Sequence, residues 1–272
     1  MTERIDTNAA LPPRALTIAG SDSGGGAGIE ADLKTFTALG AYGMAAVTAV
    51  TAQNTVGVTA IHDIPPEIVA QQIDVVASDI GVDAAKTGML GNGDVIRAVA
   101  EAVTRNGIVK LVVDPVMVAK SGDVLLQADA QEVMKDGLIP LAHVVTPNVP
   151  EAEALTGKAI DGPEGLRQVA ERLFEYGPDY VLIKGGHLEG EDAVDYLYDG
   201  TRLETFSAPR IRTKNTHGTG CTYSAAIAAY LAMGFELPEA VKKAKHYLTM
   251  AIKTSFALGG GHGPLNHFWP LD

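Results

Sequence analysis

The chain has 272 residues with 46% hydrophobic content, so it can bury a large core; we expect a flexible leader over residues 1–14 and one domain over residues 15–272. Its formal net charge of -12 disfavours a nucleic-acid partner, because phosphate backbones are bound through clustered Lys and Arg. No apolar run is long enough to span a bilayer and the N-terminus lacks the apolar core of a signal peptide, so we expect a cytoplasmic protein without a membrane partner.

The first predicted unit is a strand, a glycine-rich loop and a helix. A short, mostly apolar run over residues 16–19 stops at Gly20, and the loop 21–28 leads into a helix with the apolar positions Ile29, Leu33, Phe36 and Leu39. Asp32 falls on the same arc of this helix, so its carboxylate should face inward, where it needs a partner or a ligand. Alternatively, it only favours the N-terminal half of the helix. The loop glycines lack the spacing of a dinucleotide-binding fingerprint.

The pattern of strands and helices continues as far as residue 106. We expect a strand over residues 42–53, a second strand over 58–64, a helix over 66–78, a strand that ends in a glycine loop over 84–90, and a helix over 92–106.

Three apolar strands further along the chain end in the same way. The runs 111–113, 144–145 and 181–183 are each followed by polar residues and a chain breaker; the polar residues of interest are Asp114, Asn148 and Lys184. Continuous apolar strands separated by helices indicate a parallel sheet buried on both faces, in which ligands bind at the carboxyl ends of the strands. These three residues and Gly20 should therefore line one rim, although each alone could be an ordinary turn residue.

Asn148 opens a further helix, with Glu151 three residues on, in the arrangement of a capping box. Capping is a sufficient explanation of both residues. In the functional alternative Glu151 also holds magnesium through water, since that ion keeps much of its hydration shell. Residues 192–198 and 203–207 predict a β-hairpin that extends the sheet in an antiparallel direction, and a last amphipathic helix begins at residue 237.

Residues 215–224 contain the only cysteine of the chain, in a glycine-rich stretch before a strong helix-forming run. A single cysteine excludes an internal disulfide and a thiolate zinc site. The glycines lie where the backbone N–H groups of a helix have no intrahelical partner, and such an end attracts phosphate. The helix dipole there favours the thiolate of Cys221, and so a nucleophilic or proton-accepting role. The alternative is a small buried residue that packs the helix against the sheet.

Several short blocks follow one another in a specific order between residues 15 and 267. They are ALTIAGSDS (15–23), GGAGI (25–29), ADLKTF (31–36), TAQNT (51–55), KTGML (86–90), VDPVM (113–117), TPN (146–148), KGGH (184–187), THGTGCT (216–222) and GPLNH (263–267). Together they resemble the ribokinase-like superfamily and, within it, the hydroxymethylpyrimidine/phosphomethylpyrimidine kinase family of thiamine biosynthesis. The resemblance implies a three-layer α/β/α fold of the α/β class, with a mostly parallel central sheet, a small antiparallel hairpin extension and no large lid domain, usually in a homodimer.

The resemblance also implies an ATP phosphotransferase that converts 4-amino-5-hydroxymethyl-2-methylpyrimidine to its monophosphate and then to its diphosphate. Phosphoryl transfer asks the protein mainly for positioning and charge stabilisation. The residues expected to act on the γ-phosphate are Gly218, Thr219, Gly220, Cys221 and Lys184, with Cys221 as the base for the substrate hydroxyl. The residues expected at the ATP and metal sites are Asn148, Lys184, Asp114 and Thr216 for ATP, and Asp114 and Glu151 for Mg²⁺.

Gln53 is expected to bind the substrate ring, because an aminopyrimidine offers an exocyclic N–H donor beside a ring-nitrogen acceptor and a Gln amide matches that pair. Alternatively, Gln53 only fixes the loop that follows it. Weaker candidates for the same pocket are Gly20, Asp32, Met89 and Val116. A pyridoxine or pyridoxal kinase is the same-class alternative, although pyridoxine lacks the edge that Gln53 matches. The intact glycine–cysteine stretch disfavours a non-catalytic pyrimidine-binding protein, and the first loop's spacing disfavours an oxidoreductase.

Overall fold

The computed structural model describes residues 11–117, 130–187 and 190–271, and its largest element is an eight-stranded sheet. The strands are β1 (Arg14–Ala19), β2 (Tyr42–Val47), β5 (Ala84–Thr87), β6 (Leu111–Val113), β7 (Val144–Val145), β8 (Tyr180–Ile183), β9 (Asp192–Tyr198) and β10 (Leu203–Pro209). Their order across the sheet is β10-β9-β8-β7-β6-β5-β1-β2. The strands from β8 to β2 pair in parallel, whereas β9 and β10 pair antiparallel, which confirms the predicted hairpin extension.

The prediction of a single strand over residues 42–53 is wrong. Strand β2 pairs with β1 in the large sheet, whereas β3 (Ala49–Gln53) pairs antiparallel with β4 (Val58–Asp63) in a separate two-stranded sheet. The chain changes sheets at Thr48, whose backbone N–H donates to Ala19 (3.0 Å) and whose hydroxyl donates to the carbonyl of Met89 (2.7 Å). Apolar residues continue across this break, so periodicity alone does not reveal it.

Of the predicted leader, residues 1–14, the structure describes only residues 11–14; residues 1–10 lie outside the described residues. Strand β1 begins at Arg14, whose guanidinium lies 2.5 Å from the carboxylate of Asp83. The structured chain therefore begins before Ala15, where the sequence places the start of the domain.

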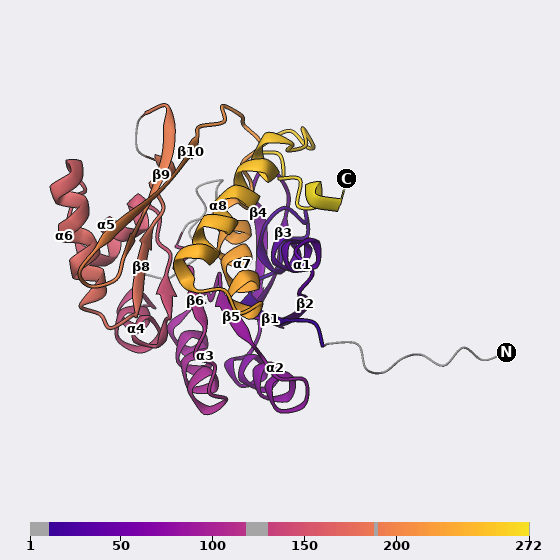
Figure 1. The fold of residues 1–272 in the computed structure, drawn as a ribbon. Coiled ribbons are helices and arrows are strands. Elements are labelled where there is room, and N and C mark those ends of the chain that lie inside the picture. Colours follow the sequence, from indigo (N-terminus) through magenta and orange to yellow (C-terminus); the bar gives the residue numbers. More distant parts are fainter. Residues whose placement is uncertain (1–10, 118–129, 188–189, 272) are drawn as a thin grey trace.

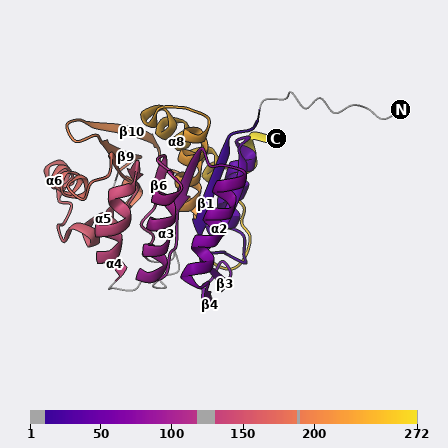
Figure 2. The ribbon, with the colours of Figure 1, turned by 90° about the horizontal axis from the view of Figure 1, so that it is seen from below.

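Helices cover both faces of the large sheet and form three layers, as Figures 1 and 2 show from two directions. Their bounds are α1 (Gly28–Ala38), α2 (Pro66–Asp79), α3 (Gly93–Arg105), α4 (Ala130–Val133), α5 (Val149–Thr156), α6 (Gly162–Phe174), α7 (Thr219–Ala232) and α8 (Leu237–Lys253), with short turns η1 (Met134–Leu138), η2 (Ile139–Leu141), η3 (Gly185–His187) and η4 (Trp269–Leu271). Helices α1, α7 and α8 bury their apolar residues on one face, and α2 to α6 do so on the other. The predicted α/β/α fold is thus confirmed. Among the described helices, none is both long and apolar enough to cross a membrane.

On the face of the large sheet that α1 and α7 cover, strands β1 and β5 carry buried polar side chains. Leu16 and Ala85 point into the core beneath α2 and α3, whereas their neighbours on the other face include Thr17 and Lys86. Both polar side chains are fully buried, and there they meet Asp32 of α1. The central strands are therefore buried on both faces, as expected of a parallel sheet, but one face encloses a small charged cluster.

The segment after α8 packs against α7 through His267, which is 2% exposed and has Nε2 3.0 Å from the hydroxyl of Thr222. Burial lowers the pKa of His267 to about 4, from an ordinary value of 6.5. Between these two pH values the unfolded chain binds a proton that the folded chain does not. The free energy of unfolding should therefore fall as the pH is lowered through this range, by about 3 kcal/mol.

Urea unfolding of the wild type and His267→Gln between pH 7 and pH 4 measures this contribution. We expect the substituted protein to be less stable at pH 7 but to lose less stability on acidification. An equal loss in both proteins would show that other groups cause the acid sensitivity.

Candidate active site

A cavity of about 990 Å³ opens at the carboxyl ends of the parallel strands. The predicted residues that line it are Gly20, Gln53, Met89, Asp114, Val116, Asn148, Glu151, Lys184, Thr216, Gly218, Thr219, Gly220 and Cys221. They come from strand ends, from α5 and from the first turn of α7. These predicted residues therefore converge at one edge of the sheet, as expected.

Lys184 and Asp114 form the charged centre of this cavity. The ammonium of Lys184 lies 2.6 Å from one carboxylate oxygen of Asp114 and 3.8 Å from the carboxylate of Glu151. Asp114 also accepts hydrogen bonds from the hydroxyls of Thr146 (3.2 Å) and Ser224 (3.3 Å). Burial would lower the pKa of Lys184, but the two carboxylates outweigh it and the pKa lies above its ordinary value, so the lysine is a permanent cation.

Glu151 closes the capping box that the sequence predicts at the start of α5. The side chain of Asn148 accepts from the backbone N–H of Glu151 (2.9 Å), and the carboxylate of Glu151 accepts from the N–H of Asn148 (2.7 Å). Burial raises the pKa of Glu151 to about 7, with Lys184 opposing the shift and Asp114 adding to it. Capping is thus confirmed, and a metal role for the same carboxylate stays a prediction.

The carboxylate oxygens in this cavity suit magnesium, provided that substrate phosphates supply further ligands. Among the described residues no group of three or more His, Cys, Asp or Glu side chains is placed to hold a metal. Asp114 and Glu151 nevertheless offer oxygen ligands within 4 Å of the Lys184 ammonium (2.6 and 3.8 Å), and magnesium is commonly bound by one or two carboxylates together with water and substrate phosphates.

Gly218 is the N-cap of α7, so the stretch 218–221 has the helix-terminal position expected from the sequence. Its φ of +80° favours glycine, and a Cβ at this position would lie 1.8 Å from the carbonyl oxygen of Gly26. A Cβ on Gly220 would lie 3.5 Å from the ammonium of Lys184 and 3.6 Å from the carboxylate of Asp114. The N–H of Thr219 donates to the carbonyl of Thr216 (3.3 Å), whereas those of Gly220 and Cys221 have no acceptor among the described residues, so the first turn of α7 offers free donors near the charged centre of the cavity.

The expectation that the helix N-terminus favours the thiolate of Cys221 is wrong for this structure. Burial raises the pKa of the thiol to about 11, and the negative charges of Asp32 and Asp114 add to the shift. Lys86 and the backbone N–H of Gly28 oppose it without reversing it. Desolvation of the thiol, which its position in the helix does not reveal, is the largest cause of the shift.

Asp32 is buried as predicted, but it does not line the cavity. One carboxylate oxygen accepts from the hydroxyl of Thr17 (2.6 Å) and from the ammonium of Lys86 (3.0 Å), while the other has no partner among the described residues. Burial raises the pKa of Asp32 against the opposing effect of Lys86. Direct contact between Asp32 and a substrate stays a prediction.

Gln53 lies at the end of β3 on the cavity wall, with the other predicted pocket residues nearby. Its backbone N–H and carbonyl both bond to the hydroxyl of Ser23 (2.8 and 2.9 Å). Its side-chain oxygen accepts from Thr51 at 3.3 Å, and no described residue accepts from its amide N–H₂. Gly20 and Met89 adjoin each other, since a Cβ on Gly20 would lie 3.3 Å from the Met89 sulfur.

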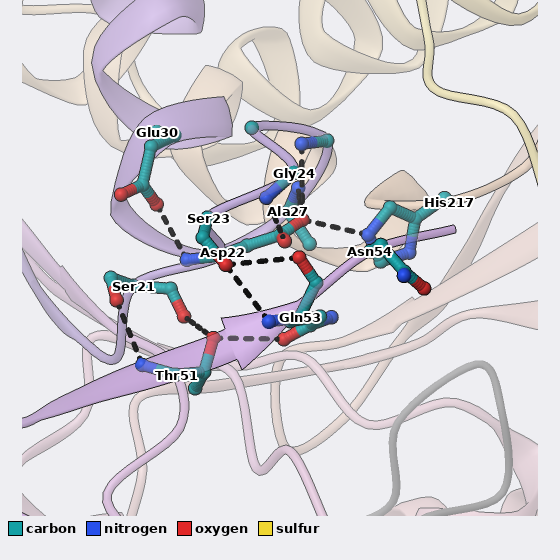
Figure 3. A network of polar contacts seen from close by, with 12 residues as sticks. Ser21, Asp22, Ser23, Gly24, Ala27, Glu30, Thr51, Gln53, Asn54 and His217 are labelled. Atoms are coloured by element: carbon teal, nitrogen blue, oxygen red, sulfur yellow. Dashed lines mark hydrogen bonds and ion pairs between the residues drawn. The ribbon is translucent and has the colours of Figure 1, made fainter. Parts of the chain in front are cut away.

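The charged or titratable cavity residues that sequence reasoning missed are Asp22, Asp195, Arg210, His217, Tyr223 and Lys245. Lys245 and Asp195 form a buried ion pair at 2.6 Å. Asp22 and His217 pair at 2.7 Å across 195 residues of sequence (Figure 3). Both lie inside motifs that the sequence displays, but only the fold brings the partners together.

A helix N-terminus, a buried lysine and two carboxylates lie around one cavity of this ribokinase-like fold, an arrangement suited to the positioning and charge stabilisation that phosphoryl transfer needs. The chain is similar to a solved pyridoxal kinase of Bacillus subtilis in complex with ADP, with a TM-score of 0.88 and 41% identity over 94% of this chain and 98% of that one. It is also similar to a phosphomethylpyrimidine kinase of Clostridium difficile, with a TM-score of 0.79 and 47% identity over 88% of this chain and 99% of that one.

The family model described as phosphomethylpyrimidine kinase matches residues 22–266, and the chain belongs to that family. A hydroxymethylpyrimidine/phosphomethylpyrimidine kinase of Rhizobium meliloti is 54% identical over 93% of this chain and 96% of its own length. A thiamine biosynthesis bifunctional protein of Geobacter sulfurreducens is 56% identical over 93% of this chain; the match spans 51% of that longer relative.

Proposed function

We propose that this chain transfers the γ-phosphate of ATP to the hydroxymethyl group of 4-amino-5-hydroxymethyl-2-methylpyrimidine, and then a second phosphate to the resulting monophosphate, in thiamine biosynthesis. Membership of the phosphomethylpyrimidine kinase family supports the reaction. The observation that carries the proposal is the approach of the first turn of α7 to Lys184 and Asp114, because a helix N-terminus beside a buried cation favours the binding of an anion.

In this mechanism the chain's own groups position and stabilise charge. The N–H groups of Gly218, Gly220 and Cys221 face the γ-phosphate oxygens as charge develops on them, and Thr219, whose N–H donates to Thr216, completes the turn. Lys184 neutralises the polyphosphate, while Asn148 and Thr216, which also line the cavity, orient it. Bound Mg²⁺, held by Asp114 and Glu151, would supply further charge neutralisation. The thiolate form of Cys221 accepts the proton of the attacking hydroxyl, and the raised pKa of the thiol keeps this form a small fraction at neutral pH.

Steady-state phosphorylation of hydroxymethylpyrimidine, its monophosphate and pyridoxine, compared side by side, tests the proposal. We expect the two pyrimidines to have the highest kcat/KM. Pyridoxine is the relevant competitor because pyridoxal kinases are among the similar structures. A higher kcat/KM for pyridoxine than for both pyrimidines would replace the proposed function with the B6 kinase alternative.

The amide N–H₂ of Gln53, which has no acceptor among the described residues, predicts how the enzyme distinguishes these substrates. Gln53→Met should reduce pyrimidine kcat/KM by an amount worth roughly 1–3 kcal/mol, the range of a lost bidentate pair, and should leave the KM for ATP nearly unchanged. Gln168→Met, on the exposed surface of α6, is the matched control. An unchanged ratio of pyrimidine to pyridoxine turnover in Gln53→Met would leave Gln53 with only the backbone role that its bonds to Ser23 describe.

We also propose that residues 15–272 act as one kinase domain, in a cytoplasmic homodimer that uses Mg²⁺. Exposed apolar side chains on the two-stranded sheet, such as Val50 (51%) and Ile61 (43%), support an association surface there. Analytical ultracentrifugation of the wild type and Val50→Lys tests the dimer. A wild type that sediments as a monomer at micromolar concentration would contradict it.

A further inference from the structure

Asp22 organises the glycine loop between β1 and α1. Its carboxylate is fully buried and accepts three backbone hydrogen bonds from that loop, from Gly26 (3.0 Å) and, labelled in Figure 3, from Gly24 (2.9 Å) and Ala27 (2.9 Å). Burial opposes the charge, but His217 and these N–H groups keep the pKa of Asp22 below its ordinary value. An ionised carboxylate therefore fixes the shape of this loop.

The carboxylate of Asp22 also contacts His217, which lies just before α7. The Nε2 atom of His217 lies 2.7 Å from Asp22, in a pair in which both side chains are buried. The backbone N–H of His217 donates to Gly263 (3.1 Å), which holds the residue from the opposite side. His217 immediately precedes Gly218, the N-cap of the helix that faces the γ-phosphate.

The glycine loop and the residues at the start of α7 also make close backbone contacts. A Cβ on Gly26 would lie 2.5 Å from the ring of His217, and a Cβ on Gly218 would lie 1.8 Å from the carbonyl oxygen of Gly26. Because the contact is this close, a displacement of the glycine loop must displace the start of α7.

At its other end the glycine loop bonds to the hairpin that presents Gln53. The hydroxyl of Ser23 bonds both backbone groups of Gln53 (2.8 and 2.9 Å), and Ser21 exchanges hydrogen bonds with Thr51 (3.1 and 2.8 Å). Figure 3 shows these bonds and the Asp22–His217 pair as one network. A continuous path therefore leads from Gln53 through Ser23, Asp22 and His217 to the start of α7.

We propose that Asp22 and His217 are a positioning pair that couples occupancy of the Gln53 pocket to the geometry of the phosphate-binding turn of α7. The inference rests on the proposed function, in which Gln53 contacts the acceptor substrate and Gly218 faces the γ-phosphate. Binding of the acceptor at β3 orders the glycine loop, and the Asp22–His217 pair transmits that order to Gly218. The acceptor and the nucleotide then bind more tightly together than separately. Neither side chain touches the reacting atoms.

Isothermal titration with a non-hydrolysable ATP analogue, in the presence and absence of the acceptor, measures the coupling directly. We expect the wild-type Kd for the analogue to tighten at least about fivefold when the acceptor is bound. In Asp22→Asn and in His217→Gln this factor should fall to near one, while each ligand alone binds within about threefold of wild type. In both variants kcat should fall about tenfold with a much smaller change in KM for ATP, since a misplaced turn weakens the transition state.

Glu30→Gln is the matched control, because Glu30 accepts a hydrogen bond from the backbone of Asp22 (2.7 Å) in the same loop but makes no bond to the α7 turn. It should keep both the coupling factor and kcat. The double variant Asp22→Asn with His217→Gln should be no worse than the single variants, as expected for two residues that act as one unit. A purely structural role would lower the melting temperature and the active fraction but leave the coupling factor of the folded protein unchanged.

The acceptor used is whichever of hydroxymethylpyrimidine and pyridoxine the wild type phosphorylates with the higher kcat/KM. A preference for pyridoxine would therefore refute the proposed function without removing the test of the coupling. An absent coupling in the wild type, or a preserved coupling in both Asp22→Asn and His217→Gln, would overturn the positioning role whichever acceptor is used.

Discussion

Cys221→Ser is expected to lower kcat for the first phosphorylation by at least about a hundredfold, with the affinity for ATP retained, because general-base assistance is typically worth about 10² to 10⁴ in rate. The substitution keeps the backbone N–H in the first turn of α7 and changes only the side chain. A serine hydroxyl is a much weaker proton acceptor than a thiolate. Cys221→Ala should show a loss of the same size, since it keeps the N–H and has no acceptor.

The raised pKa of about 11 gives this prediction a second, independent readout. If the thiolate is the base, the reactive fraction is small at neutral pH and grows with pH. The wild-type kcat should then rise steeply between pH 7 and pH 9, by up to about tenfold for each pH unit, and the rise should be absent in Cys221→Ser. Rapid-quench measurement of a single turnover separates this step from product release.

The opposite outcome has an equally clear meaning. Loose phosphoryl-transfer transition states need little base assistance. If Cys221→Ser or Cys221→Ala kept a wild-type kcat and the wild-type pH profile were flat, the side chain would not be the base. The contribution of this position would then be its N–H group in the anion-binding turn alone.

The elements that the sequence predicted well are those with a local cause. The capping box of Asn148 and Glu151 lies within one helical turn, and the hairpin of β9 and β10 has a short turn between its strands. The convergence of Asp114, Asn148 and Lys184 follows from topology, because the carboxyl ends of parallel strands lie at one edge of the sheet.

Pairings between distant residues could not be predicted in the same way. The Asp22–His217 pair joins two motifs that are each visible in the sequence, but nothing in their spacing indicates that they meet. The raised pKa of Cys221 has a similar origin, because desolvation depends on what packs over the thiol and not on its place in the helix. Lys86 is the strongest case, since a lysine in a strand is ordinarily expected to reach solvent.

Lys86→Met is expected to reduce the free energy of unfolding by about 3–5 kcal/mol, the usual effect of removing one partner of a buried ion pair. The ammonium of Lys86 lies 3.0 Å from Asp32, and neither side chain is exposed. Without it, the Asp32 carboxylate would keep only its bond to Thr17 and would have to be buried as an uncompensated charge or take up a proton. Urea unfolding at pH 7 measures the loss.

Two further variants separate this explanation from simple loss of packing. Combining Lys86→Met with Asp32→Asn should restore most of the stability, because the uncompensated charge is then gone. Arg97→Met, which breaks the exposed ion pair with Asp94 on α3, should change stability by no more than about 1 kcal/mol. A double variant as unstable as Lys86→Met alone would assign the effect to packing.

Lys86 also connects stability to the chemistry of the site, because its charge opposes the effect of burial on the thiol of Cys221. Removing that charge should raise the thiol pKa further and slow its alkylation by iodoacetamide at pH 8 to 9, since the thiolate is the reactive form. Cys221 is the only cysteine in the chain, so the reaction reports on this position alone. Equal alkylation rates in folded wild type and folded Lys86→Met would mean that the charged cluster beneath α7 stabilises the fold without influencing the thiol.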